Sequence, residues 1–470
     1  MQRRQFLRQS ALLGAGAVVG TTTGCDQVDT EPQSPISFTP GEPVPWINWA
    51  GNEHCYPQWR EAPATTEQLV DVMKSARGVI RAVGSGHSFS AVVPTDDTLV
   101  STDLLSGLVA HDPATMQATL LGGTTLHDSG PLLDAVGQAM PNLPDMDYPT
   151  IAGSIASSVH ATGAEFGSTS SYVVAMKLVT PGGDVIECSA DKNPEIFQAA
   201  RTSLGSLGIV SEVTLQNQAP FNLTEVNGVA PAQEVWSTLE DRVKDNRHFE
   251  LFTIPYSDLI LTVTTNEAKP GDKNVGEEDP QAVNSLRAAF DATAWVPLVG
   301  SALYDKLLQI AMGEAGETVR TGKSFQVFSH VRIVRFREME YTVPAEAGPA
   351  CMQEIMAKIR KERIPLSFPF EYRYVKGDDI WLSMFEGRDG CSISIHQYGD
   401  LDYKKAFAEI EPIFWKYDGR PHWGKIHTLN AERLSQLYPR HWQDFQEVRK
   451  SLDPEGRMMN AHLKHVFGEV

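Results

Sequence analysis

Cysteine is scarce in this sequence, and no two cysteines form a CxxC pair. The 470 residues include five cysteines, which are widely scattered: Cys25, Cys55, Cys188, Cys351 and Cys391. A disulfide scaffold needs a denser set, and zinc ribbons and thioredoxin-like sites need the CxxC spacing. The 13 histidines include no HExxH pattern, so a metal-dependent hydrolase is poorly supported as well.

Basic residues are also in short supply. Lys and Arg number 40 against 59 Asp and Glu, which gives a formal charge of −19. This excess of acid argues against a protein that follows nucleic-acid phosphates, so no nucleic-acid partner is expected. The composition, with 41% hydrophobic and 21% charged residues, is that of a folded globular protein. The chain exceeds the roughly 250–300 residues of a single core, so at least two domains are expected.

Long hydrophobic runs are absent. The apolar stretch at residues 11–20 is shorter than the roughly 20 residues that span a bilayer. It follows Arg3-Arg4, and the combination predicts a twin-arginine export signal over residues 1–25. Cys25 after Gly24 suggests lipid attachment, although Thr22 stands where a lipobox normally has Leu. Residues 26–45 are predicted to be a linker. We therefore expect a periplasmic protein, or one whose only membrane contact is a lipid anchor at Cys25.

Helical and strand patterns are mixed along the rest of the chain, which indicates an α+β fold. Apolar residues at helical spacing predict helices at 65–77, 126–136, 194–204 and 431–451. β-rich or alternating segments predict strands at 98–102, 116–121, 173–179, 185–188 and 209–215, and later at 329–336, 369–376, 379–384 and 391–398.

The first candidate motif is a glycine-rich turn after a short apolar strand, Val83-Gly84-Ser85-Gly86-His87-Ser88. Glycines at such a place let backbone N–H groups approach a phosphate closely. The turn is not the dinucleotide fingerprint, because the third glycine and a clear following helix are missing. On this segment alone His87 is best explained as an ordinary loop histidine.

The second motif is a long run of small and hydroxyl residues from Pro149 to Gly163, which includes Thr150, Gly153 and His160. Such a run can bring the backbone against a flat ring and a pyrophosphate. An ordinary Ser/Gly-rich loop is the alternative, but the apolar residues Ile151, Ile155 and Val159 that interrupt the run are rare in such loops.

Together these motifs resemble the vanillyl-alcohol-oxidase (PCMH) type of FAD-binding fold, and within it the sugar-1,4-lactone oxidases, which include gulonolactone and arabinonolactone oxidases. Alditol oxidase is a near relative. The resemblance runs from about Trp46 to Val466, includes residues 187–189, 195–201, 204–210, 419–425 and 452–456, and is weakest over 220–330. It implies a two-subdomain FAD-binding domain at 46–220, a substrate (cap) domain with an antiparallel sheet and helices at 221–430, and a C-terminal segment at 431–470 that returns to the FAD domain.

The resemblance implies FAD as the cofactor, bound covalently through His87 to the flavin 8α-methyl group. A second link through a cysteine is not expected, because no cysteine lies between 55 and 188. The positions that match the family's cofactor-binding segments are Val83, Gly84, Ser85, Gly86, His87, Ser88, Pro144, Thr150, Gly153, Ser154, Ser157, Ser158, His160, Gly163, Ile209, Val210 and Lys425.

The resemblance also implies the catalytic groups. Glu371 and Arg373 alternate in a predicted strand and would hold the substrate hydroxyls, while Lys425 would lie near flavin N1 and C2=O. His396 matches a pocket histidine of alditol oxidase, and an interior hydrogen-bonded histidine is an equal alternative. The implied reaction transfers hydride from a sugar lactone to flavin N5 as the hydroxyl loses its proton. Pro144 matches a gate position where Gly or Pro goes with oxygen access, which favours O2 as acceptor and H2O2 as product.

Three alternatives are open at this point. The first is a lactone dehydrogenase that passes electrons to a quinone or cytochrome. The second is an alditol oxidase acting on a polyol, for which His396 is the support. The third is a lipid-tethered sugar-binding protein without redox activity, and His87 together with Lys425 argues against it.

Overall fold

The computed structural model describes residues 44–269 and 317–468 apart from 333, together with positions 41, 272, 287, 288, 290, 291, 303, 304, 306 and 307. The predicted export signal at 1–25, Cys25 and most of the linker at 26–45 lie outside the described residues. Among the described residues, the helices are all too short or too polar to cross a bilayer.

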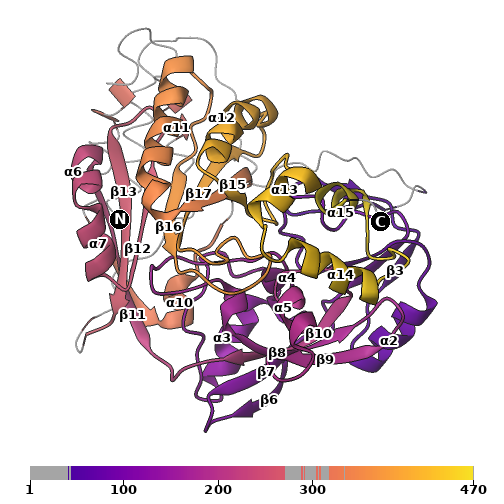
Figure 1. Cartoon of the computed structure of the whole chain (residues 1–470). Coiled ribbons are helices and arrows are strands. Elements are labelled where there is room, and N and C mark those ends of the chain that lie inside the picture. The colour runs from indigo at the N-terminus through magenta and orange to yellow at the C-terminus, as the bar shows by residue number, and fades with distance from the viewer. Residues whose placement is uncertain are drawn as a thin grey trace.

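The first half of the chain forms three small sheets (Figure 1). The parallel sheet has the order β3-β5-β4, with β3 at Trp59–Glu61, β5 at Thr98–Ser101 and β4 at Ile80–Val83. The antiparallel sheet has the order β6-β7-β10-β8-β9, with bounds Leu108–Asp112, Gln117–Leu121, Ile209–Gln216, Val173–Val179 and Val185–Ser189. The short strands β1 (Trp46–Ile47) and β2 (His54–Cys55) pair with each other.

Helices cover and connect these sheets. They are α2 (Thr66–Ser75), α3 (Leu126–Asp134), α4 (Ile151–Ala156) and α5 (Pro194–Ala200), with a 3₁₀ turn at Thr169–Tyr172. Helix α2 begins as the sequence predicts: the Thr65 side chain accepts a hydrogen bond from the Gln68 backbone N–H, and Leu69 and Met73 face the core. They pack on a small cluster that includes Ile80 and Met458, which stand 378 positions apart in the chain.

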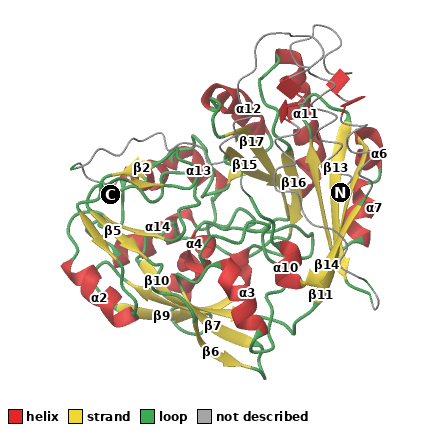
Figure 2. Ribbon diagram, turned by 180° about the vertical axis from the view of Figure 1, so that it is seen from behind, coloured by secondary structure: helices red, strands yellow, loops and turns green. Residues whose placement is uncertain are grey.

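The second half is built on one eight-stranded antiparallel sheet (Figure 2). Its order is β14-β11-β13-β12-β16-β17-β15-β18. In that order the strands span Thr318–Lys323, Asn222–Pro231, Leu259–Glu267, His248–Thr253, Phe370–Val375, Gly390–Tyr398, Phe336–Pro344 and Arg420–Pro421.

The two faces of this sheet differ in what covers them. The outer face packs against α6 (Ala232–Ser237), α7 (Leu239–Asp245), α11 (Gly348–Glu362) and α12 (Lys404–Lys416), which Figure 1 shows along that side. Representative contacts are the stacked rings of Tyr341 and Phe414 and the edge contact of Trp236 with Tyr372. The inner face is directed toward the first half of the chain, and the short helix α10 (Ser324–Phe328) packs there against α3.

Two predicted strands are wrong. Residues 329–332, 334 and 335 are irregular, and β15 instead runs from Phe336 to Pro344, where alternate side chains lie on opposite faces of the sheet. Residues 379–384 form a turn and not a strand. The reason is local: the Asp378 carboxylate accepts hydrogen bonds from the Ile380 N–H at 3.1 Å and the Ser383 hydroxyl at 2.6 Å, which curls the backbone.

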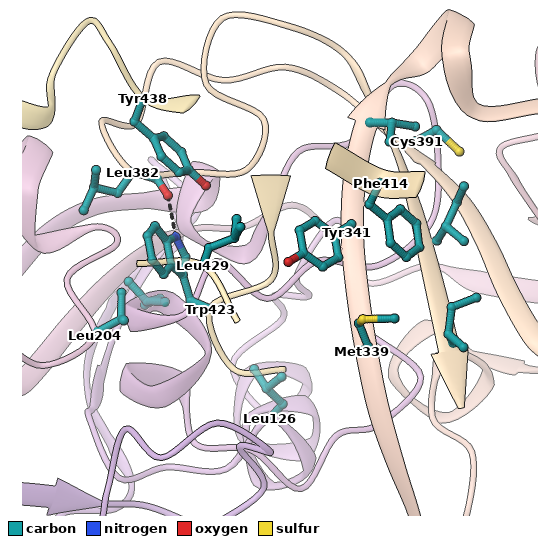
Figure 3. Close-up of a cluster of buried hydrophobic side chains, with 14 of the residues drawn as sticks. Leu126, Leu204, Met339, Tyr341, Leu382, Cys391, Phe414, Trp423, Leu429 and Tyr438 are labelled. Atoms are coloured by element: carbon teal, nitrogen blue, oxygen red, sulfur yellow. Dashed lines mark hydrogen bonds between the residues drawn. The ribbon is translucent and has the colours of Figure 1, made fainter. Parts of the chain in front are cut away.

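The C-terminal segment returns to the first half as three helices. These are α13 (Ala431–Leu437), α14 (Trp442–Leu452) and α15 (Ala461–Phe467), where the sequence predicts one helix over 431–451. Pro439 lies in the break between α13 and α14, as expected for a residue that cannot continue a helix. Figure 3 shows the apolar cluster around Trp423, whose indole N–H donates to the Leu382 carbonyl at 2.7 Å.

Candidate active site

The glycine-rich turn follows strand β4 directly, as the sequence predicts. Val83 ends the strand, and Gly86 adopts a φ of +68°, a conformation that side chains disfavour. The Gly86 carbonyl accepts from the Trp49 N–H at 2.8 Å, and the Ser85 hydroxyl donates to the Tyr148 carbonyl. The turn is thus fixed by contacts from both sides, and residue 87 is presented between them.

His87 lies between two aromatic rings. Its imidazole stacks on Trp49 at 5.2 Å between centroids and on Tyr148 at 5.8 Å. Nδ1 is buried and has no hydrogen-bond partner in the protein. Burial, together with the nearby charge of Lys425, lowers the pKa of His87 to about 4. The ring is therefore neutral at pH 7, with a buried nitrogen that lacks a partner.

The small-residue segment packs against this turn. Thr150 caps helix α4 by accepting from the Gly153 N–H at 3.2 Å, and a Cβ at Gly84 would lie only 2.5 Å from the Thr150 hydroxyl. Only glycine fits at that close approach. Ser154 is buried on α4 and its hydroxyl has no partner, whereas the Ser157 hydroxyl donates to the Gly153 carbonyl.

The other predicted cofactor positions lie around this junction. Ile209 and Val210 begin β10, and the Val210 carbonyl lies 2.2 Å from where a Cβ at Gly122 would be. Ser158 has a positive φ of 58°, and Gly163 has a φ of +129° beside β16. Pro144 is buried in the segment that follows Asn142, whose side chain donates to the Thr162 carbonyl. The Ser88 carbonyl accepts from Asn48 at 2.8 Å.

Lys425 lies near His87 although it belongs to the far end of the sequence. The Phe89 N–H donates to the Gly424 carbonyl, and the Ser90 hydroxyl donates to the Trp423 carbonyl, both at 2.7 Å. The Lys425 ammonium lies 4.8 Å from the centre of the Phe89 ring. The structure therefore brings together the glycine-rich turn and the lysine that the sequence analysis singled out.

Charged side chains gather on the inner face of the large sheet. In the sheet registry, Glu371 and Glu340 lie on either side of Ser394. Glu338 lies opposite His396. These side chains therefore share one face of the sheet. Arg373 lies opposite Glu250 of β12 in the sheet registry. All of these residues are buried. Buried charges occur in proteins when they are paired, so this face is organised by its ion pairs.

Arg373 is the central cation of the face. Its guanidinium Nη2 lies 3.1 Å from Glu371 and 3.2 Å from Glu340. Burial alone would lower the pKa of Arg373, but these carboxylates raise it above its usual value. Burial raises the pKa of Glu371 to about 7, even with Arg373 acting in the opposite direction. Glu371 can therefore exchange a proton near neutral pH.

His396 and Lys425 share one carboxylate. The Lys425 ammonium contacts Glu338, and His396 Nε2 lies 3.6 Å from the same side chain. His396 Nδ1 lies 2.8 Å from the Pro369 carbonyl, so the ring is oriented on both sides. Burial would raise the pKa of Glu338, but Lys425 and His396 outweigh burial and lower it to about 2.

This site contains three buried acidic residues that were not predicted from the sequence: Glu250, Glu338 and Glu340. The available signal was the alternation of Glu338-Met339-Glu340, which the predicted strand at 329–336 did not reach. His160 was expected at the cofactor; its Nε2 lies 2.5 Å from Glu340 of the substrate-side sheet. His422 was noted only as part of a motif, and it lies beside the same carboxylate.

The residues present fit a flavin. A flavin attached to a histidine needs a neutral ring nitrogen with no protein partner, and His87 Nδ1 provides it. A pyrophosphate needs close backbone approach, which the turn at Gly84 and the cap of α4 provide. A cation near the ring is available in Lys425.

Comparison with known proteins identifies the class. A family described as FAD binding domain matches residues 57–189. The solved structure of cholesterol oxidase from B. sterolicum superposes with a TM-score of 0.73 over 92% of this chain and 99% of that one, at 16% identity, and so shares the PCMH-type fold. The chain is a FAD-dependent oxidoreductase that acts on CH–OH groups.

The family follows from the second half of the chain. A family described as D-arabinono-1,4-lactone oxidase matches residues 213–466. The L-gulono-1,4-lactone dehydrogenase of Mycobacterium tuberculosis is 35% identical over 433 residues, 90% of this chain and 99% of the relative. The L-gulonolactone oxidase of Bos taurus is 30% identical over 438 residues, 90% and 98% respectively. The chain belongs to the aldonolactone oxidase and dehydrogenase family.

Proposed function

We propose that this protein oxidises a hydroxyl of an aldono-1,4-lactone and passes the electrons to O2. The observation that carries the proposal is the buried inner face of the sheet, where Glu371 pairs with Arg373, and where His396 and Lys425 share the Glu338 carboxylate. A sugar lactone offers several hydroxyls and a carbonyl, and such a face supplies both donors and acceptors to hold them.

Each residue has a distinct task. When bound, FAD supplies the two-electron acceptor for the hydride that leaves the substrate carbon. Arg373 donates hydrogen bonds to substrate oxygens, and its Nε is buried without a partner in the protein. Glu371, with a pKa of about 7, accepts the hydroxyl proton as the C=O bond forms. His396 orients the same hydroxyl, and Lys425 stabilises negative charge near the cofactor.

The electrons and protons that the substrate loses determine the second product. The substrate loses two electrons and two protons when its CH–OH becomes C=O, and O2 takes up both to give H2O2. Pro144, buried at the gate position beside the small-residue segment, supports O2 as the acceptor. The alternative is a dehydrogenase with a quinone or cytochrome acceptor, and one of the relatives is named as a dehydrogenase.

The experiment is to mix the purified protein, in air and then anaerobically, with a panel of 1,4-aldonolactones and alditols. Bleaching of the flavin with prompt peroxide supports the oxidase. Bleaching without peroxide identifies a dehydrogenase and contradicts the role of Pro144. Bleaching by alditols and not by lactones favours the polyol substrate, for which the buried His396 is the supporting observation.

We also propose that His87 carries the flavin covalently. Precipitation of the wild-type protein with acid should give a yellow pellet, and a His87→Ala variant should give a colourless one. His127→Ala is the matched control, because His127 stacks on the same Tyr148 ring but its side chain is 64% exposed. Full release of flavin from the wild type would contradict the covalent link.

The N-terminus extends this proposal to the location of the protein. Arg3-Arg4 and the apolar stretch after them support export by the twin-arginine route to the periplasm, with Cys25 as a candidate lipid anchor. A covalent cofactor suits an exported enzyme, because FAD that dissociates outside the cytoplasm cannot be replaced. Fractionation of cells that express the full chain, compared with an Arg3→Lys/Arg4→Lys variant, tests this location.

A further inference from the structure

Two buried carboxylates on strand β15 stand between the two halves of the molecule. Glu338 and Glu340 are two residues apart, so both side chains lie on the inner face of the sheet. They are 3% and 1% exposed. Each contacts one side chain from the flavin-side segments, Lys425 or His160, and also contacts the substrate-side strands.

Glu338 joins Lys425 to His396. Lys425 belongs to the segment that is hydrogen-bonded to the glycine-rich turn, through Gly424 and Phe89. His396 belongs to β17 and lies directly opposite Glu338 in the sheet registry. One carboxylate oxygen faces each partner: Oε2 faces the ammonium and Oε1 faces the imidazole at 3.6 Å. The charge of Lys425 reaches His87, whose pKa it lowers.

Glu340 repeats this arrangement two residues later. Its Oε1 lies 2.5 Å from Nε2 of His160, which belongs to the small-residue segment. Its Oε2 lies 3.2 Å from Arg373 and accepts from the Ser394 hydroxyl at 2.9 Å. His160 Nδ1 lies 2.9 Å from the Ala161 carbonyl. The ring is therefore held between a carbonyl on one side and a carboxylate on the other.

Both carboxylates are held in the charged form. Burial would raise the pKa of each, but Lys425 lowers that of Glu338, and His160 with Arg373 lowers that of Glu340 well below its usual value. His160, Glu340 and His422 offer ligand atoms within 4.8 Å of one another, a spacing that would suit a metal ion. Two contacts oppose that: Arg373 already occupies Glu340, and His422 Nδ1 accepts from the Gly424 N–H, which puts the proton on Nε2.

We propose that Glu338 and Glu340 are positioning residues that set the flavin-side groups Lys425 and His160 in register with the substrate-holding groups. Glu338 holds Lys425 at the cofactor and partly neutralises its charge there, and Glu340 holds Arg373 against the substrate. This inference rests on the proposed function for the place of cofactor and substrate. Strand β15, which carries both carboxylates, thus aligns two parts of the site that come from distant segments of the chain.

The test compares Glu338→Gln and Glu340→Gln with Glu411→Gln in the flavin-loaded protein. Glu411 is a matched control: it is buried, and it bonds the Tyr341 hydroxyl on the outer face and Thr428 beside the Lys425 segment. Flavin content and thermal midpoint measure any general loss of structure. The flavin reduction potential, the affinity for sulfite and the rate of reduction by substrate measure positioning.

Glu338→Gln should raise the flavin potential and tighten sulfite binding by roughly tenfold, because the Lys425 charge is no longer balanced. Adding Lys425→Met to Glu338→Gln should abolish this change, which a purely structural role of Glu338 would not predict. Glu340→Gln should leave the potential near the wild-type value and reduce the rate of flavin reduction by about 10²-fold, because Arg373 is misplaced.

The proposal is overturned if Glu338→Gln and Glu340→Gln change only the thermal midpoint, as Glu411→Gln is expected to do. Failure of the proposed function is a separate result. If neither lactones nor alditols reduce the wild-type flavin, the substrate is wrong, yet the potential and sulfite measurements on Glu338→Gln need no substrate and still decide the role of that residue.

Discussion

Alternate residues of strand β15 lie in opposite environments. Glu338 and Glu340 face the flavin-binding half in a network of ion pairs, whereas Met339 and Tyr341 face helix α12 in an apolar layer. Figure 3 shows Met339 and Tyr341 beside Phe414 on that side. Both faces are equally buried, so burial alone does not separate them.

The difference shows how one sheet supports both stability and chemistry. The apolar layer stabilises the fold by removing hydrocarbon from water. Buried ion pairs add little net stability, because desolvation offsets their attraction, but removing one partner leaves an unpaired buried charge. The inner face is therefore the more sensitive to single substitutions of charge, and the outer face to changes of volume. The following predictions test this comparison.

The largest effect is expected on the inner face, at Arg373. Arg373→Met leaves Glu340 and Glu371 without their shared cation. The free energy of unfolding should fall by about 3–5 kcal/mol, and reduction of the flavin by substrate should be lost. Urea denaturation and stopped-flow absorbance measure these two changes. Arg373→Lys keeps the charge and should recover most of the stability but little of the rate, since a lysine cannot contact both carboxylates in the same geometry.

An outer-face substitution should separate stability from activity. Ile393 is fully buried on β17, on the face opposite Ser394 and His396. Ile393→Ala should lower the free energy of unfolding by about 2–4 kcal/mol through the cavity it leaves, with Ile393→Val near 1 kcal/mol. The rate of flavin reduction should stay at the wild-type value. A rate that fell in proportion to the lost stability would show that the two faces are not independent.

Glu371 should give the inner face a distinct pH dependence. Its pKa rises from 4.5 to about 7 on folding, so the folded protein binds this proton more tightly than the unfolded chain. The stabilisation is present below pH 4.5 and is lost as the pH rises toward 7. The Glu371→Gln variant has no such group to titrate. Its free energy of unfolding, relative to that of the wild type, should therefore rise by up to about 3 kcal/mol between pH 4.5 and pH 7. Denaturation curves at pH 4.5 and pH 7.5 provide the comparison; parallel behaviour of the two proteins would contradict it.

The smallest effect is expected from an ion pair outside the site. Lys177 and Glu212 face each other across β8 and β10 at 2.7 Å, with side chains 28% and 18% exposed. Lys177→Met should change the free energy of unfolding by less than about 1 kcal/mol, because solvent screens the pair. A loss as large as that of Arg373→Met would mean that burial is not what makes the inner face sensitive.

The sequence predicts the flavin-side segments better than the sheet. The turn at 84–88 and the run at 149–163 carry local signals, since their glycines and hydroxyl residues are needed by the backbone conformation itself. The strands at 369–376 and 391–398 were also predicted, and with them the shared face of Glu371 and Arg373.

The acidic partners could not be found in the same way. Glu338 and Lys425 are 87 positions apart, and Glu340 and His160 are 180 apart. No local pattern reports a contact at such separations, and the predicted strand ended where β15 begins. The predicted strand at 379–384 was wrong for the opposite reason. A single side chain, Asp378, accepts hydrogen bonds that curl the backbone in spite of the apolar pattern of the residues that follow it.

The return of the C-terminal segment has a consequence for how the protein is made. The guanidinium of Arg81, on one of the first strands, donates to the Met458 carbonyl at 2.7 Å, and Asn460 bonds the carbonyls of Ala91 and Pro94. The N-terminal half therefore lacks these contacts until residues 458–460 have left the ribosome, which at roughly 5–20 residues per second takes on the order of half a minute or more. The contacts that join the C-terminal segment to the flavin-binding half thus form late in synthesis, and a chain that ends before Met458 should hold the cofactor less well.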